Sequence, residues 1–134
     1  MKRFLSFVCS LVLVLSLFLG GCSADPTNLT GNFRQDTLAL IDSLRTAITV
    51  PDDSADKKVA QADARTKINS FIARYRRDDS LTSLASFTTM RTALNSLAGH
   101  YSSYPNRPLP DKLKKRLEQE FQQVELALSR EPAA

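Results

Sequence analysis

Residues 113–128, LKKRLEQEFQQVELAL, carry the clearest helical pattern of the chain. Apolar side chains recur there every three or four positions, with charged and amide side chains between them. The apolar positions are Leu113, Leu117, Phe121, Val124 and Leu128. Because an α-helix turns once in about 3.6 residues, this spacing places them on one face. The stretch therefore predicts an amphipathic helix that buries one side and ends before Pro132.

Two earlier stretches repeat this pattern. A helix is expected over roughly 33–50, stopped by Pro51. Its apolar stripe is Leu38, Ile41, Leu44 and Ile48, flanked by Leu40 and Ala47. A second helix is expected after an N-cap at Asp53 or Ser54. Its apolar face is Ala60, Ala64, Ile68, Phe71, Ile72 and Tyr75.

A third helix is expected to begin at Asp79 or Ser80 and to end before Pro105. Its stripe is Leu84, Phe87, Leu94, Leu97 and Tyr101, with Met90 beside it. No sustained alternation of apolar and polar residues predicts a strand. Four helices of similar length, each with one apolar stripe, predict an all-α fold, an up-down-up-down four-helix bundle over residues 33–131. Helices of about 20 residues would make it roughly 30 Å long.

The N-terminal segment has the composition of a secretory signal peptide. Lys2 and Arg3 precede an apolar run from Phe4 to Leu19, and small residues follow at Gly20 and Gly21. The run is shorter than the roughly 20 residues of a permanent membrane helix. We expect residues 1–21 to be removed and the mature chain to begin at Cys22.

Leu19-Gly20-Gly21-Cys22 looks like a bacterial lipobox, in which the cysteine receives a diacylglyceryl group. Cys9 leaves with the signal, so Cys22 has no disulfide partner within the chain. We expect an S-diacylglyceryl and N-acyl lipid on Cys22, which would anchor the protein firmly. The alternative is an ordinary signal peptide with an accidental cysteine. Residues 22–32 are expected to form a flexible polar tether.

Charge and residue types limit the possible functions. Loss of Lys2 and Arg3 reduces the 18 basic side chains to 16, against 14 acidic ones, which is too balanced for nucleic-acid binding. After the signal, the only histidine is His100 and the only cysteine is Cys22, too few for a catalytic dyad or a structural zinc site. The paired aspartates at 52–53 and 78–79 are best explained as caps in turns. We expect the protein to have no enzymatic activity, no metal site and no cofactor apart from the lipid.

Three groups of residues are candidates for a partner-binding surface. The first is Arg74, Arg76, Arg77 and Asp78, although charges at helix ends can simply complement helix dipoles. The second is Tyr104 and Arg107, in a connection stiffened by three prolines between 105 and 110. The third is Lys112, Lys115 and Arg116, because positive charge at the start of a helix opposes the dipole and suggests another use. His100 is a candidate pH sensor, with an ordinary helical histidine as the alternative.

A resemblance to a known family rests on residues 75–120, YRRDDSLTSLASFTTMRTALNSLAGHYSSYPNRPLPDKLKKRLEQE, and 30–45, TGNFRQDTLALIDSLR. These stretches closely resemble the cyanobacterial photosystem II assembly lipoproteins, whose plant relatives are the photosystem II eleven-kilodalton proteins. Stretches such as HYSSYPNRPLP are highly specific. The resemblance implies a four-helix bundle on the lumenal face of the cellular thylakoid membrane.

It also implies a function and a partner. Such a protein binds photosystem II intermediates that lack a working manganese cluster, through the lumenal loop of the forty-three-kilodalton chlorophyll-binding core antenna. It would act as a monomer in assembly and repair and delay attachment of the extrinsic subunits. The alternatives are a permanent lumenal lipoprotein subunit of the mature complex and an envelope lipoprotein that binds a hydrophobic ligand. Because the first cluster and the other two follow different helices, they are expected at opposite ends of the bundle.

Overall fold

A computed structural model describes residues 29–132, so the predicted signal peptide and Cys22 lie outside the described residues. All the regular secondary structure in this part of the chain is helical. Its helices are α2 (Phe33–Thr49), α3 (Lys57–Tyr75), α4 (Asp79–Thr82), α5 (Ala85–Ser103) and α6 (Asp111–Arg130). None of the helices within 29–132 combines the length and the apolar character needed to cross a membrane.

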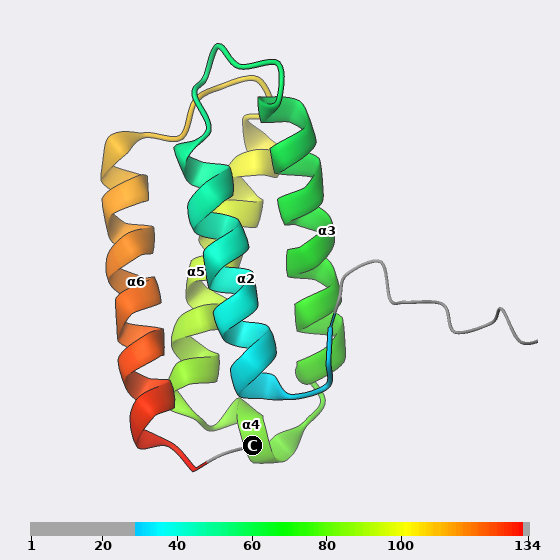
Figure 1. Ribbon diagram of the computed structural model, residues 1–134, viewed down its shortest axis with the longest axis vertical. Coiled ribbons are helices and arrows are strands. Elements are labelled where there is room, and N and C mark those ends of the chain that lie inside the picture. The colour runs from blue at the N-terminus through cyan, green and yellow to red at the C-terminus, as the bar shows by residue number, and fades with distance from the viewer. Residues whose placement is uncertain (1–28, 133–134) are drawn as a thin grey trace, which may run out of the picture.

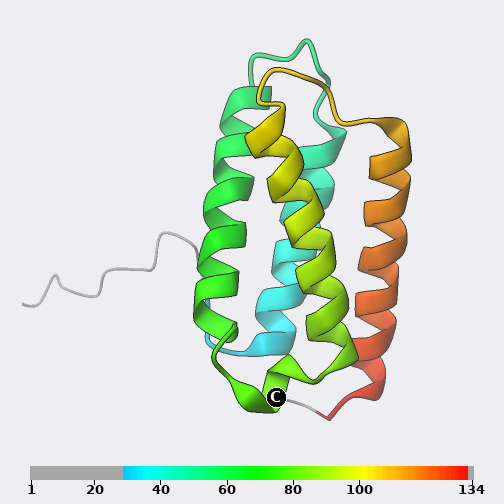
Figure 2. The same ribbon diagram turned by 180° about the vertical axis from the view of Figure 1, so that it is seen from behind.

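The four long helices run alternately up and down, with the one-turn α4 between α3 and α5 (Figure 1). Each packs against two neighbours: α2 against α3 and α6, and α5 against α3 and α6 (Figure 2). The prediction of an all-α, up-down-up-down bundle is therefore confirmed. The connections 50–56 and 104–110 form what we call the upper end. Residues 29–32, α4 and the residues after α6 form the lower end (Figure 1).

The apolar stripes meet along the axis of this bundle. In α6 the predicted face is correct: all its members are buried except Leu113, which is half-buried. Towards the lower end the core is aromatic, and the ring of Phe33 lies 5.4 Å from that of Tyr75 and 6.1 Å from that of Phe71. Such ring contacts add to the stabilisation from apolar burial.

The predicted stripe of α2 is wrong at one position. Leu38 is 39 % exposed, whereas Leu40, expected only to flank the stripe, is 5 % exposed. The buried face also includes Asp36 and Thr37, which an apolar pattern does not predict because both side chains are polar. Helix α2 contacts both α3 and α6, so the buried arc is set by two neighbours rather than by the spacing of leucines alone.

The predicted start of the second helix is also wrong. Helix α3 begins at Lys57, after turns that include Asp53 and Ser54. The Ser54 hydroxyl accepts a hydrogen bond from the Asp56 N–H at 3.2 Å, and the Ser54 carbonyl accepts one from the Lys57 N–H. Ser54 therefore orders a turn instead of capping the helix.

The third helix begins at Asp79 as predicted but does not continue. It stops after Thr82, and Leu84 is extended, with φ −69° and ψ 141°, before α5 starts at Ala85. The side chain of Glu131, at the far end of α6, accepts hydrogen bonds from the N–H and hydroxyl of Ser86. This carboxylate satisfies a free donor at the new helix start, which explains why the break is tolerated.

Candidate partner-binding surfaces

The candidate clusters lie at opposite ends of the bundle, as expected. Arg74, Arg76, Arg77 and Asp78 are at the lower end, where α3 meets α4. Tyr104, Arg107, Lys112, Lys115 and Arg116 are at the upper end, where α5 is joined to α6 (Figure 1). A small footprint on a partner can therefore include only one of these groups.

At the lower end, Asp36 joins three segments of the chain. Its carboxylate is 2 % exposed and accepts hydrogen bonds from the Thr30 N–H at 2.8 Å, the Thr30 hydroxyl at 2.7 Å and the Gly31 N–H at 3.1 Å. The Tyr75 hydroxyl also donates to it. Residues 30–31 were expected to belong to the flexible tether, but Asp36 holds them against the bundle. Leu29 also packs against the core.

These contacts govern the ionisation of both side chains. Burial acts to raise the pKa of Asp36, but the hydrogen bonds from Tyr75, Thr30 and Gly31 outweigh it and lower the pKa. Burial and the neighbouring Asp36 carboxylate raise the pKa of Tyr75. Asp36 is therefore an ionised carboxylate that accepts from a neutral tyrosine. Sequence reasoning missed it, because the only local signal is an aspartate near the start of a helix.

One member of the charged cluster at the lower end, Asp78, has a structural role within the bundle. Gly31 has φ 86°, and a Cβ at this position would lie 2.9 Å from Nη2 of Arg74. Asp78 caps α4, because its carboxylate accepts from the Ser80 N–H at 3.0 Å. The alternative that these charges serve the ends of the helices is therefore correct for Asp78. Arg76 and Arg77 remain exposed.

At the upper end the connection between α5 and α6 presents an aromatic and cationic group. The guanidinium carbon of Arg107 lies 5.3 Å from the ring centroid of Tyr104, which is 47 % exposed. The ring centroid of His100 lies 5.4 Å from that of Tyr104. Stacking limits the freedom of Tyr104 and Arg107, so a partner would order them at small cost. The role of His100 as a pH sensor stays a prediction.

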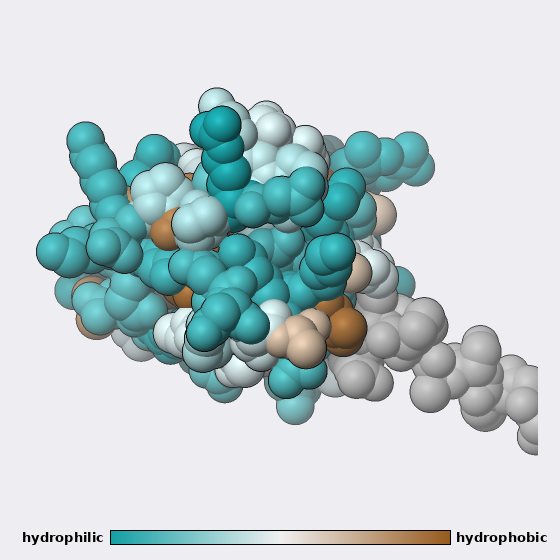
Figure 3. Space-filling view, turned by 90° about the horizontal axis from the view of Figure 1, so that it is seen from above, coloured by the Kyte–Doolittle hydropathy of each residue, from teal (hydrophilic) through white to brown (hydrophobic). Residues whose placement is uncertain are grey.

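The first turn of α6 adds positive charge to the same end. Lys112 and Lys115 are exposed and form no ion pair within residues 29–132. Arg116 pairs with Glu120 at 2.9 Å, as its spacing predicts. Together with Pro110 and Leu113, Lys112 and Arg116 line an open hollow. Seen from above, the upper end is dominated by hydrophilic side chains (Figure 3).

Lys114 and Glu118 lie four positions apart on α6, a spacing that suits an ion pair, but they do not form one. Glu118 instead binds Arg45 of α2 at 2.8 Å, and Arg45 also binds Glu125 at 2.6 Å. The two glutamates hold the pKa of Arg45 above its ordinary value. Glu118 and Glu125 of α6 are therefore compensated by a cation on a neighbouring helix. Sequence spacing within one helix cannot show this contact.

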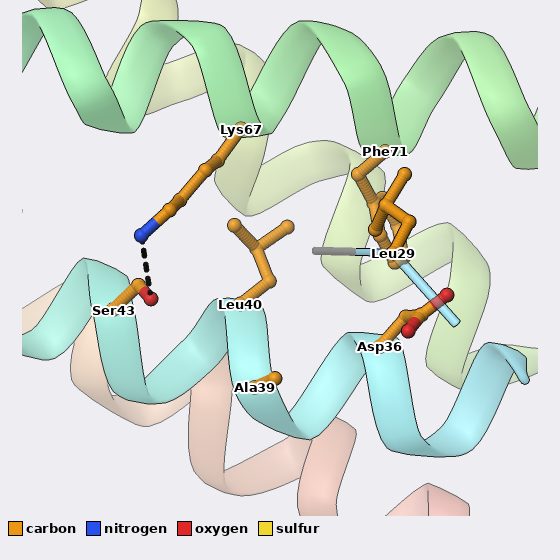
Figure 4. Close-up of a pocket in the computed structure, with 7 residues that line it drawn as sticks. All are labelled: Leu29, Asp36, Ala39, Leu40, Ser43, Lys67 and Phe71. Carbon is orange, nitrogen blue, oxygen red and sulfur yellow. Dashed lines mark hydrogen bonds between the residues drawn. The ribbon is translucent and has the colours of Figure 1, made fainter. Parts of the chain in front are cut away.

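A hollow between α2 and α3 is crossed by polar side chains. Lys67 of α3 donates to the hydroxyl of Ser43 on α2 at 3.2 Å, and Leu29 and Phe71 line the hollow further along (Figure 4). Asp36 lies at the same end of the hollow as Leu29 (Figure 4).

The acidic pairs have partners of their own. Asp52 binds Lys57 at 3.1 Å, and Asp78 caps a helix. Within residues 29–132, no three His, Cys, Asp or Glu side chains lie close enough together to hold a metal ion.

Comparison with known proteins places this bundle in one family. Residues 3–128 match the model of the family described as Photosystem II Pbs27. The chain is 70 % identical over 131 residues to the photosystem II assembly factor lipoprotein Psb27 of Thermosynechococcus vestitus, covering 98 % of both chains. It is 50 % identical over 130 residues to the photosystem II lipoprotein Psb27 of Synechocystis, covering 97 % of this chain and 96 % of that one. The solution structure of Psb27 from cyanobacterial photosystem II superposes with a TM-score of 0.75 at 53 % identity, covering 82 % of this chain and 96 % of that chain.

Proposed function

The chain belongs to the photosystem II Pbs27 family, and from this premise we propose that it is a non-catalytic factor in the assembly and repair of photosystem II. The names of its relatives support this role, since they are described as a photosystem II assembly factor lipoprotein and a photosystem II lipoprotein. A rigid bundle with exposed cationic and aromatic groups suits a protein that acts by binding.

The partner within photosystem II is, in this proposal, the lumenal loop of the forty-three-kilodalton core antenna. The protein binds intermediates that lack a working manganese cluster and delays attachment of the extrinsic subunits. We assign the contact to the upper end, because it combines the exposed ring of Tyr104, over which Arg107 lies, with the exposed cations Lys112 and Lys115. Arginine and tyrosine are frequent anchors of protein interfaces.

The membrane anchor, in this proposal, is the lipid on Cys22, on the lumenal side of the thylakoid membrane. Leu29 packs against the core and lines the hollow between α2 and α3. Cys22 lies seven positions before Leu29, and each position extends a chain by at most about 3.5 Å, so the lipid is attached within about 25 Å of Leu29.

Affinity purification from thylakoid membranes tests this proposal. The tagged chain is expected to recover the core antenna in a fraction that lacks extrinsic subunits and evolves little oxygen. Charge reversal at Arg107, Lys112 and Lys115 should reduce recovery by at least about tenfold. Reversal at Arg76 and Arg77, which are also exposed but at the lower end, is the matched control.

Each result has a distinct meaning. Recovery with fully active complexes would make the protein a permanent subunit instead. Equal loss from reversal at both ends, or no loss at either, would contradict the assignment of the upper end. Failure to recover any photosystem II subunit would refute the assembly role itself.

A further inference from the structure

A second hollow at the upper end lies between the first half of α3 and the end of α5. Lys58, Gln61 and Arg65 of α3 line it, together with Tyr101 of α5 and Asn106 of the following connection. It continues into an adjoining hollow that shares Lys58, Gln61 and Asn106. None of these residues except Tyr101 contributes to the predicted apolar stripes.

Tyr101 is the unusual member of this lining. The residue is 1 % exposed, and its hydroxyl forms no hydrogen bond to any group in residues 29–132. Burial raises the pKa of Tyr101 to about 12, so the phenol keeps its proton and can donate it. A buried hydroxyl without a partner is unfavourable, which points to an acceptor supplied from outside the described residues.

The charges around the hollow specify the kind of acceptor. Lys58 and Arg65 are exposed, lie two turns apart on α3 and form no ion pair within the described part of the chain. No acidic side chain lines this hollow. In the adjoining hollow, Asp52 is already paired with Lys57 at 3.1 Å. Two cations without ion pairs and the buried Tyr101 therefore line the same hollow.

The amide side chains complete the set of donors. Gln61 and Asn106 each carry two N–H groups, and a carboxylate can accept about four hydrogen bonds on its two oxygens. Hydrogen bonds to a charged acceptor are roughly twice as strong as neutral ones. A neutral or cationic ligand would leave the two positive charges uncompensated.

We propose that this hollow binds a carboxylate side chain, from aspartate or glutamate, in an acidic segment of the protein partner. The chemistry of the site is argued from its own residues, whereas the identity of the partner rests on the proposed function. A phosphate of a lipid headgroup is the less suitable ligand. The hollow lies at the upper end, beside the connection 104–110, whereas Leu29, the first described residue, lines a different hollow together with Asp36 in the first turn of α2.

Nuclear magnetic resonance of the mature chain without its lipid tests the chemistry. The probe is the peptide acetyl-Glu-Glu-amide, titrated to millimolar concentration at constant ionic strength. Signals of Gln61, Tyr101 and Asn106 are expected to shift in a saturable manner. A chain with Lys58→Gln and Arg65→Gln should bind at least about tenfold more weakly, because both charged donors are lost.

Tyr101→Phe tests the buried hydroxyl alone. It keeps the ring in the core, so the helical circular dichroism should not change, while the affinity for the peptide should fall several-fold. Ser96→Ala is the matched control, because it removes a hydroxyl from the same helix at a position that does not line the hollow. Unchanged affinity in both Tyr101→Phe and the Lys58–Arg65 variant would overturn the proposal. So would saturable binding of inorganic phosphate at these residues with no binding of the peptide.

The same variants in the thylakoid purification separate this inference from the proposed function. Weaker recovery of the core antenna by the Lys58–Arg65 variant would support the hollow as part of the contact. Normal recovery by that variant would overturn its role towards the partner and leave the assembly role intact. If the unmodified chain recovers no photosystem II subunit but still binds the peptide, the proposed function fails and the carboxylate site stands.

Discussion

Replacing Asp36 with asparagine removes the charge that holds α3 and residues 30–31 to α2. One carboxylate oxygen accepts both bonds from Thr30, and the other accepts those from Gly31 and Tyr75. An asparagine amide has only one oxygen, so its NH₂ group must face two donors whichever way it is turned.

The size of the effect follows from this count. Two hydrogen bonds to a charged acceptor are worth roughly 1.5–3 kcal/mol each. Part of that loss is offset because a neutral amide is less costly to bury than a carboxylate. We expect Asp36→Asn to lower the free energy of unfolding by about 2–4 kcal/mol.

Urea denaturation at neutral pH, followed by circular dichroism, measures the effect. With a slope of about 1.5 kcal/mol per molar urea, a loss of about 3 kcal/mol moves the midpoint down by about 2 M. Asp42→Asn is the matched control, since Asp42 is an exposed aspartate on the same helix. It should change the free energy of unfolding by less than about 0.5 kcal/mol.

The pH dependence has a definite sign. Because the folded-state pKa of Asp36 lies below its ordinary value, its ionised form stabilises the fold fully above the unfolded pKa. That contribution is lost as pH falls through the folded-state pKa. The difference in stability between the original chain and Asp36→Asn should therefore be largest near neutral pH and should shrink below about pH 4.

Two results would refute this reasoning. The first is a midpoint for Asp36→Asn equal to that of Asp42→Asn, which would mean that the hydrogen bonds contribute nothing net. The second is a difference that grows as pH falls below about 4, which would require the folded state to favour the protonated carboxyl.

Three further changes test other contacts. Glu131→Ala should lower the free energy of unfolding by about 1–2 kcal/mol, because Ser86 loses its acceptor, and should speed amide hydrogen exchange in the first turn of α5. Unchanged exchange would contradict this cap. Gly31→Ala should cost about 1–3 kcal/mol in thermal unfolding, because φ is 86° and the new Cβ would meet Arg74; an unchanged midpoint would show that the segment relaxes freely. Arg45→Met should cost no more than about 1 kcal/mol, since the partners are partly exposed, and the cost should shrink as sodium chloride is raised; a salt-independent cost would indicate lost packing instead.

The sequence alone was sufficient for the type of fold and for most helix limits. The apolar spacing in α6 correctly predicts Leu117, Phe121, Val124 and Leu128 as core residues, because apolar side chains recur there with the period of one helix. Pro51 and Pro105 correctly predict where α2 and α5 end, because proline acts on the backbone of its immediate neighbours. The separation of the candidate clusters also follows from helix order alone.

Tertiary structure decided the features that depend on groups distant in the chain. Glu131 caps a helix start 45 residues earlier, and Arg45 compensates glutamates 73 and 80 residues later. Asp36 and Tyr75 meet only because α2 and α3 pack side by side, and Tyr101 becomes an unpaired donor only because burial removes it from water. Local patterns report periodicity and backbone preference, whereas hydrogen bonds between packed helices depend on the rotation of each helix about its axis, which its neighbours determine.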